Sequence, residues 1–136
     1  MSFANSNRAL SQYRQVDVHG GVAAASPHRL IQMLMRGAQE KIACARGHLA
    51  RGEYADKGRH IGGAAAIIEA LETSLDMARG EVIAANLAAL YDYMKRGLLE
   101  ANAKNDDARL AEVAGLLGQV QSGWDAIADA PEAMGR

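Results

Sequence analysis

The chain of 136 residues is poor in several residue types that mark common protein classes. Its single cysteine, Cys44, excludes a disulfide within the chain and fits a reducing compartment. Aromatic residues make up 4% and there are two prolines, which disfavours a β-sheet and leaves long stretches available for helix. The formal net charge of −1 offers no electrostatic basis for binding nucleic acid or an anionic membrane.

Long hydrophobic runs are also missing. No stretch has the roughly 18 uncharged apolar residues of a membrane span, and residues 1–10 lack the apolar run of a signal peptide. We therefore expect a cytoplasmic protein. Its length suits one ordinary domain, and hydrophobic residues, at 49%, are sufficient for a core.

Four segments show helical periodicity, with apolar residues recurring at steps of three and four. They cover residues 26–52, 53–78, 81–104 and 107–130. Ser26 and Pro27 have the N-cap and N1 preferences of a helix start, and Gly52 is a suitable helix stop. On the third segment the expected core positions are Ile83, Leu87, Leu90, Met94, Leu98 and Ala101, with Tyr91 at their edge. Trp124 lies on the apolar face of the fourth segment, and we expect it to be largely buried.

Helices joined by such short turns must run antiparallel to their neighbours in the chain. The sequence therefore predicts an all-α protein, an antiparallel up-down four-helix bundle over residues 26–130. A flexible N-terminal arm, residues 1–25, precedes the bundle, and a flexible C-terminal tail, residues 131–136, follows it.

The sequence contains few of the residue patterns that form catalytic or metal sites. Di-iron bundles use Glu-x-x-His pairs, and no histidine of this chain has a glutamate three positions before it. There is no Cys-x-x-Cys-His haem attachment, although spacing leaves open a haem held by one histidine and one methionine. Cys44, one position off the first apolar face, is expected to be a small, partly buried hydrophobic residue. We predict no enzyme activity, no metal and no cofactor.

A second apolar stripe runs beside the main one on the second segment, through Gly63, Ile67, Ala70, Ser74 and Met77. One interpretation is a broader core contact with a neighbouring helix. The other is a shallow groove that receives a partner helix, because methionine adapts to varied surfaces. The candidate partner-binding residues are Leu10, Tyr13, Ile67, Ala70, Ser74, Met77 and Tyr91.

Several blocks resemble the flagellar secretion chaperones, the FliS family. The most specific is Leu-Tyr-Asp-Tyr-Met at 90–94, followed by Leu-Leu-x-Ala-Asn-x-Lys-Asn-Asp at 98–106. Leu10-x-x-Tyr13, the Ala-Ser-Pro-His block at 25–28, residues 111–117 and Trp124 extend the resemblance over most of the chain. Three positions depart from the family pattern, namely Met35, Gly97 and Ala103.

The resemblance implies a chaperone that binds the C-terminal segment of flagellin in the cytosol, prevents premature polymerisation and keeps the subunit competent for flagellar type III secretion. It also implies docking at a component of the flagellar export gate, with the N-terminal arm near the flagellin site. A helical adaptor for another export substrate or regulator, and a metal- or haem-binding bundle, are the alternatives.

Overall fold

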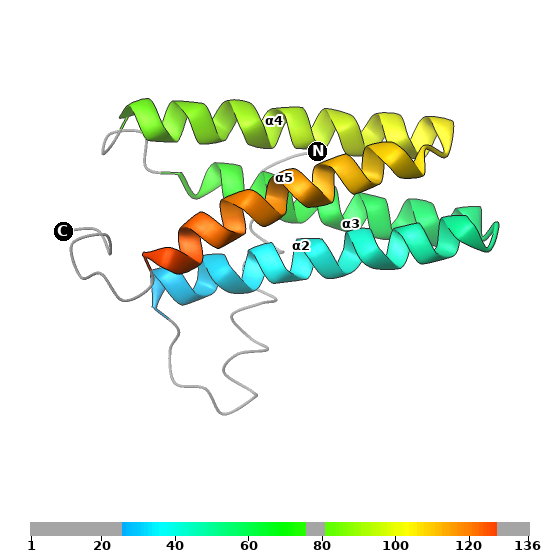
Figure 1. The fold of residues 1–136 in the computed structure, drawn as a ribbon, viewed down its shortest axis with the longest axis horizontal. Helices are drawn as coiled ribbons and strands as arrows, with labels where there is room; N and C mark the ends of the chain where they lie inside the picture. The colour runs from blue at the N-terminus through cyan, green and yellow to red at the C-terminus, as the bar shows by residue number, and fades with distance from the viewer. Residues whose placement is uncertain (1–25, 76–80, 128–136) are drawn as a thin grey trace.

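The structure, a computed structural model, describes residues 26–75 and 81–127, and within them it contains four α-helices and no β-strand (Figure 1). The helices are α2 (Pro27–Ala50), α3 (Tyr54–Thr73), α4 (Glu81–Lys104) and α5 (Asp107–Ala126). The predicted all-α class and the four helices are confirmed. The arm, residues 1–25, and the tail, residues 131–136, lie outside the described residues.

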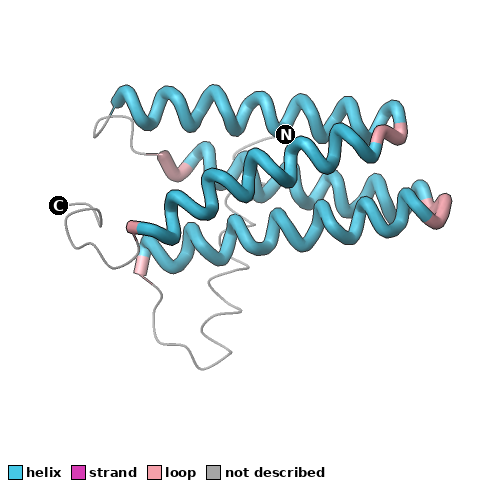
Figure 2. The backbone as a smooth tube through the Cα atoms, viewed as in Figure 1, coloured by secondary structure: helices cyan, strands magenta, loops and turns pink. Residues whose placement is uncertain are grey.

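Each helix packs against two others, so that the order around the bundle is α2, α3, α4, α5 and back to α2. The turn from α2 to α3 and the turn from α4 to α5 lie at the same end of the bundle, as Figure 2 shows. α5 is inclined to the other helices: it starts beside the end of α4 and finishes beside the start of α2 (Figure 1). This inclination shapes the surface considered below.

The helix starts and turns follow the local sequence signals. Ser26 is the N-cap of α2, and its hydroxyl accepts a hydrogen bond of 3.0 Å from the Arg29 amide. Asp106 does the same for α5, accepting from the Arg109 amide at 3.1 Å. Gly52 (φ 74°) and Asn105 (φ 52°) take the left-handed conformation that ends the preceding helices.

α3 ends at Thr73, earlier than the predicted limit at residue 78. Two hydroxyls account for the stop, because each bonds to a backbone carbonyl near the end of the helix. Thr73 Oγ1 donates to the Glu69 carbonyl at 2.9 Å, and Ser74 Oγ donates to the Leu71 carbonyl at 2.7 Å. Ser74 is therefore the C-cap residue rather than a position on the helix.

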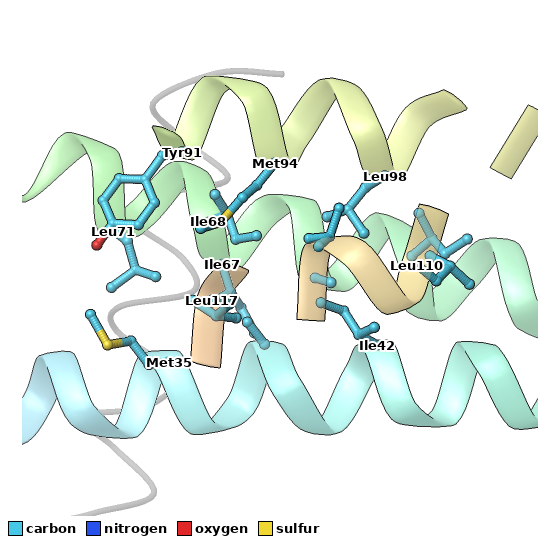
Figure 3. Close-up of a cluster of buried hydrophobic side chains, with 14 of the residues drawn as sticks. Met35, Ile42, Ile67, Ile68, Leu71, Tyr91, Met94, Leu98, Leu110 and Leu117 are labelled. Carbon is cyan, nitrogen blue, oxygen red and sulfur yellow. The ribbon is translucent and has the colours of Figure 1, made fainter. Parts of the chain in front are cut away.

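One hydrophobic core runs between the four helices (Figure 3). Most of the expected core positions are buried, and Met35, which the periodicity did not select, is buried as well. Two expectations are wrong, because Ile83 is 68% exposed instead of buried and Cys44 is exposed. Trp124 is partly buried and packs against the core. Periodicity identifies the apolar face of a helix, but the neighbouring helix decides how much of that face is covered.

Two pairs of hydrogen-bonded residues connect the ends of neighbouring helices. Lys57 on α3 is buried, and its ammonium donates to the backbone carbonyl of Asn102 at 2.9 Å and to its side-chain Oδ1 at 2.7 Å. His28 and Trp124 stack with ring centroids 4.5 Å apart. The Trp124 indole donates to the His28 carbonyl at 3.1 Å, and His28 Nε2 lies 2.9 Å from the Trp124 carbonyl. The first pair joins α3 to the end of α4, and the second joins α2 to the end of α5.

Candidate partner-binding surface

Three of the residues predicted to form a partner groove lie inside the bundle. Ile67, Ala70 and Tyr91 are each 2% exposed or less and belong to the hydrophobic core (Figure 3). Burial also raises the pKa of the Tyr91 phenol to about 12. Of the two interpretations of this stripe, the broader core contact is the one that fits the burial of these three residues.

The other predicted residues do not complete such a groove. Ser74 is exposed, at the end of α3, with its hydroxyl bonded to the backbone of its own helix. Leu10, Tyr13 and Met77 lie outside the described residues. Partner binding at these four positions stays a prediction.

Large exposed apolar side chains occur at three separate places in the described part of the chain. Tyr54 begins α3 and is 57% exposed, while Ile83 and Leu99, at opposite ends of α4, are 68% and 63% exposed. Single exposed apolar residues are ordinary on a protein surface. Ile83 differs from the others because it lies on the apolar face of its helix and has half-exposed apolar neighbours.

α4 and α5 pack closely near the turn that joins them. A Cβ added at Gly97 would lie 3.0 Å from Val113 Cγ2, so a larger residue at this position would push the two helices apart. On the same side, the Tyr93 hydroxyl of α4 donates to Glu112 of α5 at 2.6 Å. The Arg109 guanidinium lies 5.2 Å from the centre of the Tyr93 ring. The flank of α4 that carries Tyr93 therefore faces the flank of α5 that carries Glu112.

Away from the turn, the same two flanks become apolar and less covered. One and two turns after Glu112 come Leu116 and Val120, both half-buried. On α4, Leu90 is half-buried one turn before Tyr93, and Ile83 lies two turns further towards the helix start. The inclination of α5 separates the helices at this end (Figure 1). We group Ile83, Leu90, Leu116 and Val120, the exposed or partly buried apolar residues of these two flanks, under the name α4–α5 opening.

A recess lies where α2 meets the start of α5. It is lined by Ala43, Arg46, Gly47, Leu49, Ala50 and Asp107. Arg46 and Asp107 form a two-pronged ion pair across it, at 2.8 and 3.0 Å. This hydrogen-bonded pairing lowers the pKa of the Asp107 carboxyl. The charges across the recess make it less suitable than the α4–α5 opening for an apolar partner.

The residues of block 90–106, the most specific part of the family resemblance, mainly hold the helices together. Asn102 receives the buried Lys57, Asn105 supplies the left-handed turn residue, and Asp106 caps α5. Tyr91 is a core residue and Tyr93 links α4 to α5. This block therefore sets how α4 and α5 meet. Lys57 carried no signal in its own segment, because its partner Asn102 is 45 positions away.

The departures from the family pattern fall in different surroundings. Met35 fills part of the core, and Gly97 lies at the close contact between α4 and α5. Ala103 is exposed. Within residues 26–75 and 81–127, no helix is both long and apolar enough to cross a membrane.

Comparisons with known proteins agree with the sequence pattern and the four helices. The family model described as "Flagellar protein FliS" matches residues 9–131. The chain is 48% identical over 120 residues to the flagellar secretion chaperone FliSB of Pseudomonas aeruginosa, covering 88% of this chain and 95% of that protein. It is 43% identical over 119 residues to the flagellar secretion chaperone FliS of Salmonella typhimurium, covering 87% and 88% of the two chains.

More distant relatives bear the same description. The flagellar secretion chaperone FliS of Bacillus subtilis is 34% identical over 103 residues, which is 76% of each chain. These proteins are described as chaperones, not as enzymes. The extent of the family match and the identity to full-length relatives together show that the chain belongs to the FliS family of flagellar secretion chaperones.

Proposed function

We propose that this protein binds the C-terminal segment of flagellin in the cytosol, prevents its premature polymerisation and keeps it competent for flagellar type III secretion. Membership of a family of flagellar secretion chaperones supports an export substrate as the partner. A component of the flagellar export gate is the second partner that we propose. Neither role requires a catalytic group.

The observation that carries the proposal is the α4–α5 opening. Ile83 and Leu90 on α4 and Leu116 and Val120 on α5 are apolar residues that are exposed or only partly buried. An amphipathic segment that folds into a helix can lay its apolar side chains into such a surface, at spacings of three and four residues. The segment becomes ordered as it binds, and this ordering opposes several kcal/mol of the contact energy, so that the complex stays releasable.

We also retain the four untested residues as part of the proposed site. Leu10 and Tyr13, three positions apart, present one apolar side if the arm forms a helical turn. We propose that this pair borders the flagellin site, together with Ser74 and Met77 after α3. Changing Leu10 and Tyr13 to alanine should then weaken flagellin binding and leave the melting of the bundle nearly unchanged. A variant with lower thermal stability and unchanged affinity would remove the pair from the site.

Titration calorimetry with flagellin, with and without its C-terminal segment, tests the partner. We expect binding of the complete flagellin and at least about a tenfold loss, ~1.4 kcal/mol, when the segment is removed. Equal affinity for both forms would refute the proposed segment. Binding of unrelated amphipathic peptides as tightly as the flagellin peptide would instead indicate a general helical adaptor.

A matched pair of substitutions on α4 tests the surface. Ile83 and Leu99 are aliphatic residues of similar exposure on the same helix, but only Ile83 borders the α4–α5 opening. Ile83→Asp should weaken flagellin binding at least about tenfold, because an unpaired carboxylate would be buried in an apolar interface. Leu99→Asp should bind normally. Equal effects of the two substitutions, or none, would place the flagellin site elsewhere, and thermal melting of both variants checks that the fold is kept.

A further inference from the structure

Three metal-ligating side chains gather at the turn between α2 and α3, and a second histidine lies beside them. His48 is in the last turn of α2, Glu53 lies between the helices, and Asp56 is in the first turn of α3. One ligand atom from each of these three residues lies within 4.8 Å of the other two. The ring of His60, one turn after Asp56, lies 4.9 Å from the ring of His48, centroid to centroid. The cluster thus combines one imidazole with two carboxylates, and a second imidazole packs against the first.

The backbone of the turn holds these groups in place. Gly52 takes φ 74°, and the Glu53 amide donates back to the His48 carbonyl at 2.9 Å. Glu53 occupies the N-cap position of α3, yet its side chain makes no capping hydrogen bond. Its Oε1 instead lies 2.7 Å from His48 Nδ1. The turn therefore directs a carboxylate towards an imidazole across a chain reversal.

His60 is oriented by its own helix. Its Nδ1 lies 2.9 Å from the Asp56 backbone carbonyl, which can only accept a hydrogen bond, so Nδ1 carries the proton in this contact. In the neutral ring, Nε2 then has its lone pair available. A hydrogen bond from one imidazole nitrogen to a carbonyl is the usual outer-shell arrangement of a metal-binding histidine, because it fixes the tautomer and the ring orientation.

We propose that this cluster binds one divalent transition-metal ion of the zinc class, with His48, Glu53 and Asp56 as ligands and His60 as the fourth. Mixed imidazole and carboxylate donors suit zinc, whereas magnesium and calcium prefer oxygen alone. Bonds of about 2.0–2.2 Å place ligand atoms roughly 3–4 Å apart. The ligand atoms of His48, Glu53 and Asp56, which lie within 4.8 Å of one another, therefore require only a small contraction. The ion joins α2 to α3 across their turn, and this role goes beyond flagellin binding.

Two guanidinium groups compete with the ion. Arg51 Nε lies 3.0 Å from Glu53, and Arg59 lies 2.6 Å from Asp56. Both arginine side chains are well exposed, at 58% and 68%, so they can swing into solvent without leaving a buried charge. Exposed ion pairs of this kind contribute little to stability. Displacing them weakens the metal site without excluding it.

The test uses the untagged full chain and Zn²⁺ as the probe. Calorimetry should show one Zn²⁺ per chain with a dissociation constant in the micromolar range, and a saturating amount should raise Tm by several degrees. The same concentration of Mg²⁺ should leave Tm unchanged.

Substitutions identify the ligands. His48→Gln and Asp56→Asn should each weaken Zn²⁺ binding by at least about tenfold. Asp92→Asn is the matched control, because Asp92 is also an exposed helical carboxylate paired with an arginine, Arg96, at 2.9 Å. Cys44→Ser, which removes the exposed thiol, should leave binding unchanged. The proposal fails if Zn²⁺ does not bind, if His48→Gln binds as well as the parent chain, or if Cys44→Ser abolishes binding. None of these outcomes depends on flagellin.

Discussion

Replacing the buried Lys57 by methionine tests whether its contact with Asn102 stabilises the bundle. Lys57 is 4% exposed, and its ammonium makes two hydrogen bonds, of 2.9 and 2.7 Å, to Asn102 near the end of α4. Methionine has a similar length and helix propensity, so the substitution mainly removes the ammonium. Hydrogen bonds to a charged group contribute about 1.5–3 kcal/mol, and water can reach the half-buried Asn102 in the variant. We expect Lys57→Met to lower the free energy of unfolding by about 2 kcal/mol.

Urea and thermal unfolding followed by circular dichroism measure this loss, which corresponds to a fall in Tm of roughly 5–12 °C. Lys104→Met is the matched control, because Lys104 is 67% exposed and pairs only with Glu100 one turn away. Its effect should stay within about 0.5 kcal/mol. A Lys57→Met variant as stable as the parent chain would show that burial of the ammonium offsets its hydrogen bonds, and would remove this contact from the forces that hold α3 to α4.

Three further tests use the same unfolding assays. Ala70→Asp, at a core position that is 1% exposed, should lose at least about 3 kcal/mol or fail to fold; cooperative melting near the parent Tm would contradict its burial. Gly62→Ala should stabilise the chain by about 0.5–1 kcal/mol, because no atom lies within 4 Å of the added Cβ. Gly97→Ala should not stabilise it, because the added Cβ would lie 3.0 Å from Val113. Equal stabilisation by the two substitutions would be inconsistent with the close contact at Gly97. The hydrogen-bonded pairing with Arg46 lowers the pKa of Asp107 from 3.8. The stabilisation from this pair is therefore present above pH 3.8 and is lost as the pH falls through the lowered pKa of the folded state. Asp107→Asn should make Tm depend less on pH in this acidic range, and an unchanged dependence would count against the pair.

The local features of the fold could be predicted from the sequence, because they depend on neighbouring residues. Ser26 and Asp106 cap their helices through amides three positions further on, and Gly52 ends α2 through its own backbone conformation. The end of α3 was missed, although the signal was present. Thr73 and Ser74 can both bond to carbonyls of the preceding turn, and this competition favours a helix stop over continuation.

The candidate surface could not be predicted in the same way. A three-four pattern shows that Ile83 and Ala70 each lie on an apolar stripe of their helix, but it carries no information on the neighbouring helix. The structure buries Ala70, for which core contact and exposed groove were both open, and it exposes Ile83, which we expected to be buried. The inclination of α5 depends on contacts between residues that are far apart in the chain, such as His28 with Trp124. Such pairs have no local sequence signal.

The turn between α4 and α5 sets the angle between these two helices. α5 has 20 residues and is therefore about 30 Å long, so a rotation of about 5° at Asn105 and Asp106 would move its far end by about 2.6 Å. The side chains that hold this turn lie at one end of the bundle, whereas Val120 and Ile83 lie towards the other. A substitution at Asn102 or Gly97 can therefore change the width of the α4–α5 opening without touching any residue that lines it. Screens for variants with altered partner affinity should include this turn as well as the surface itself.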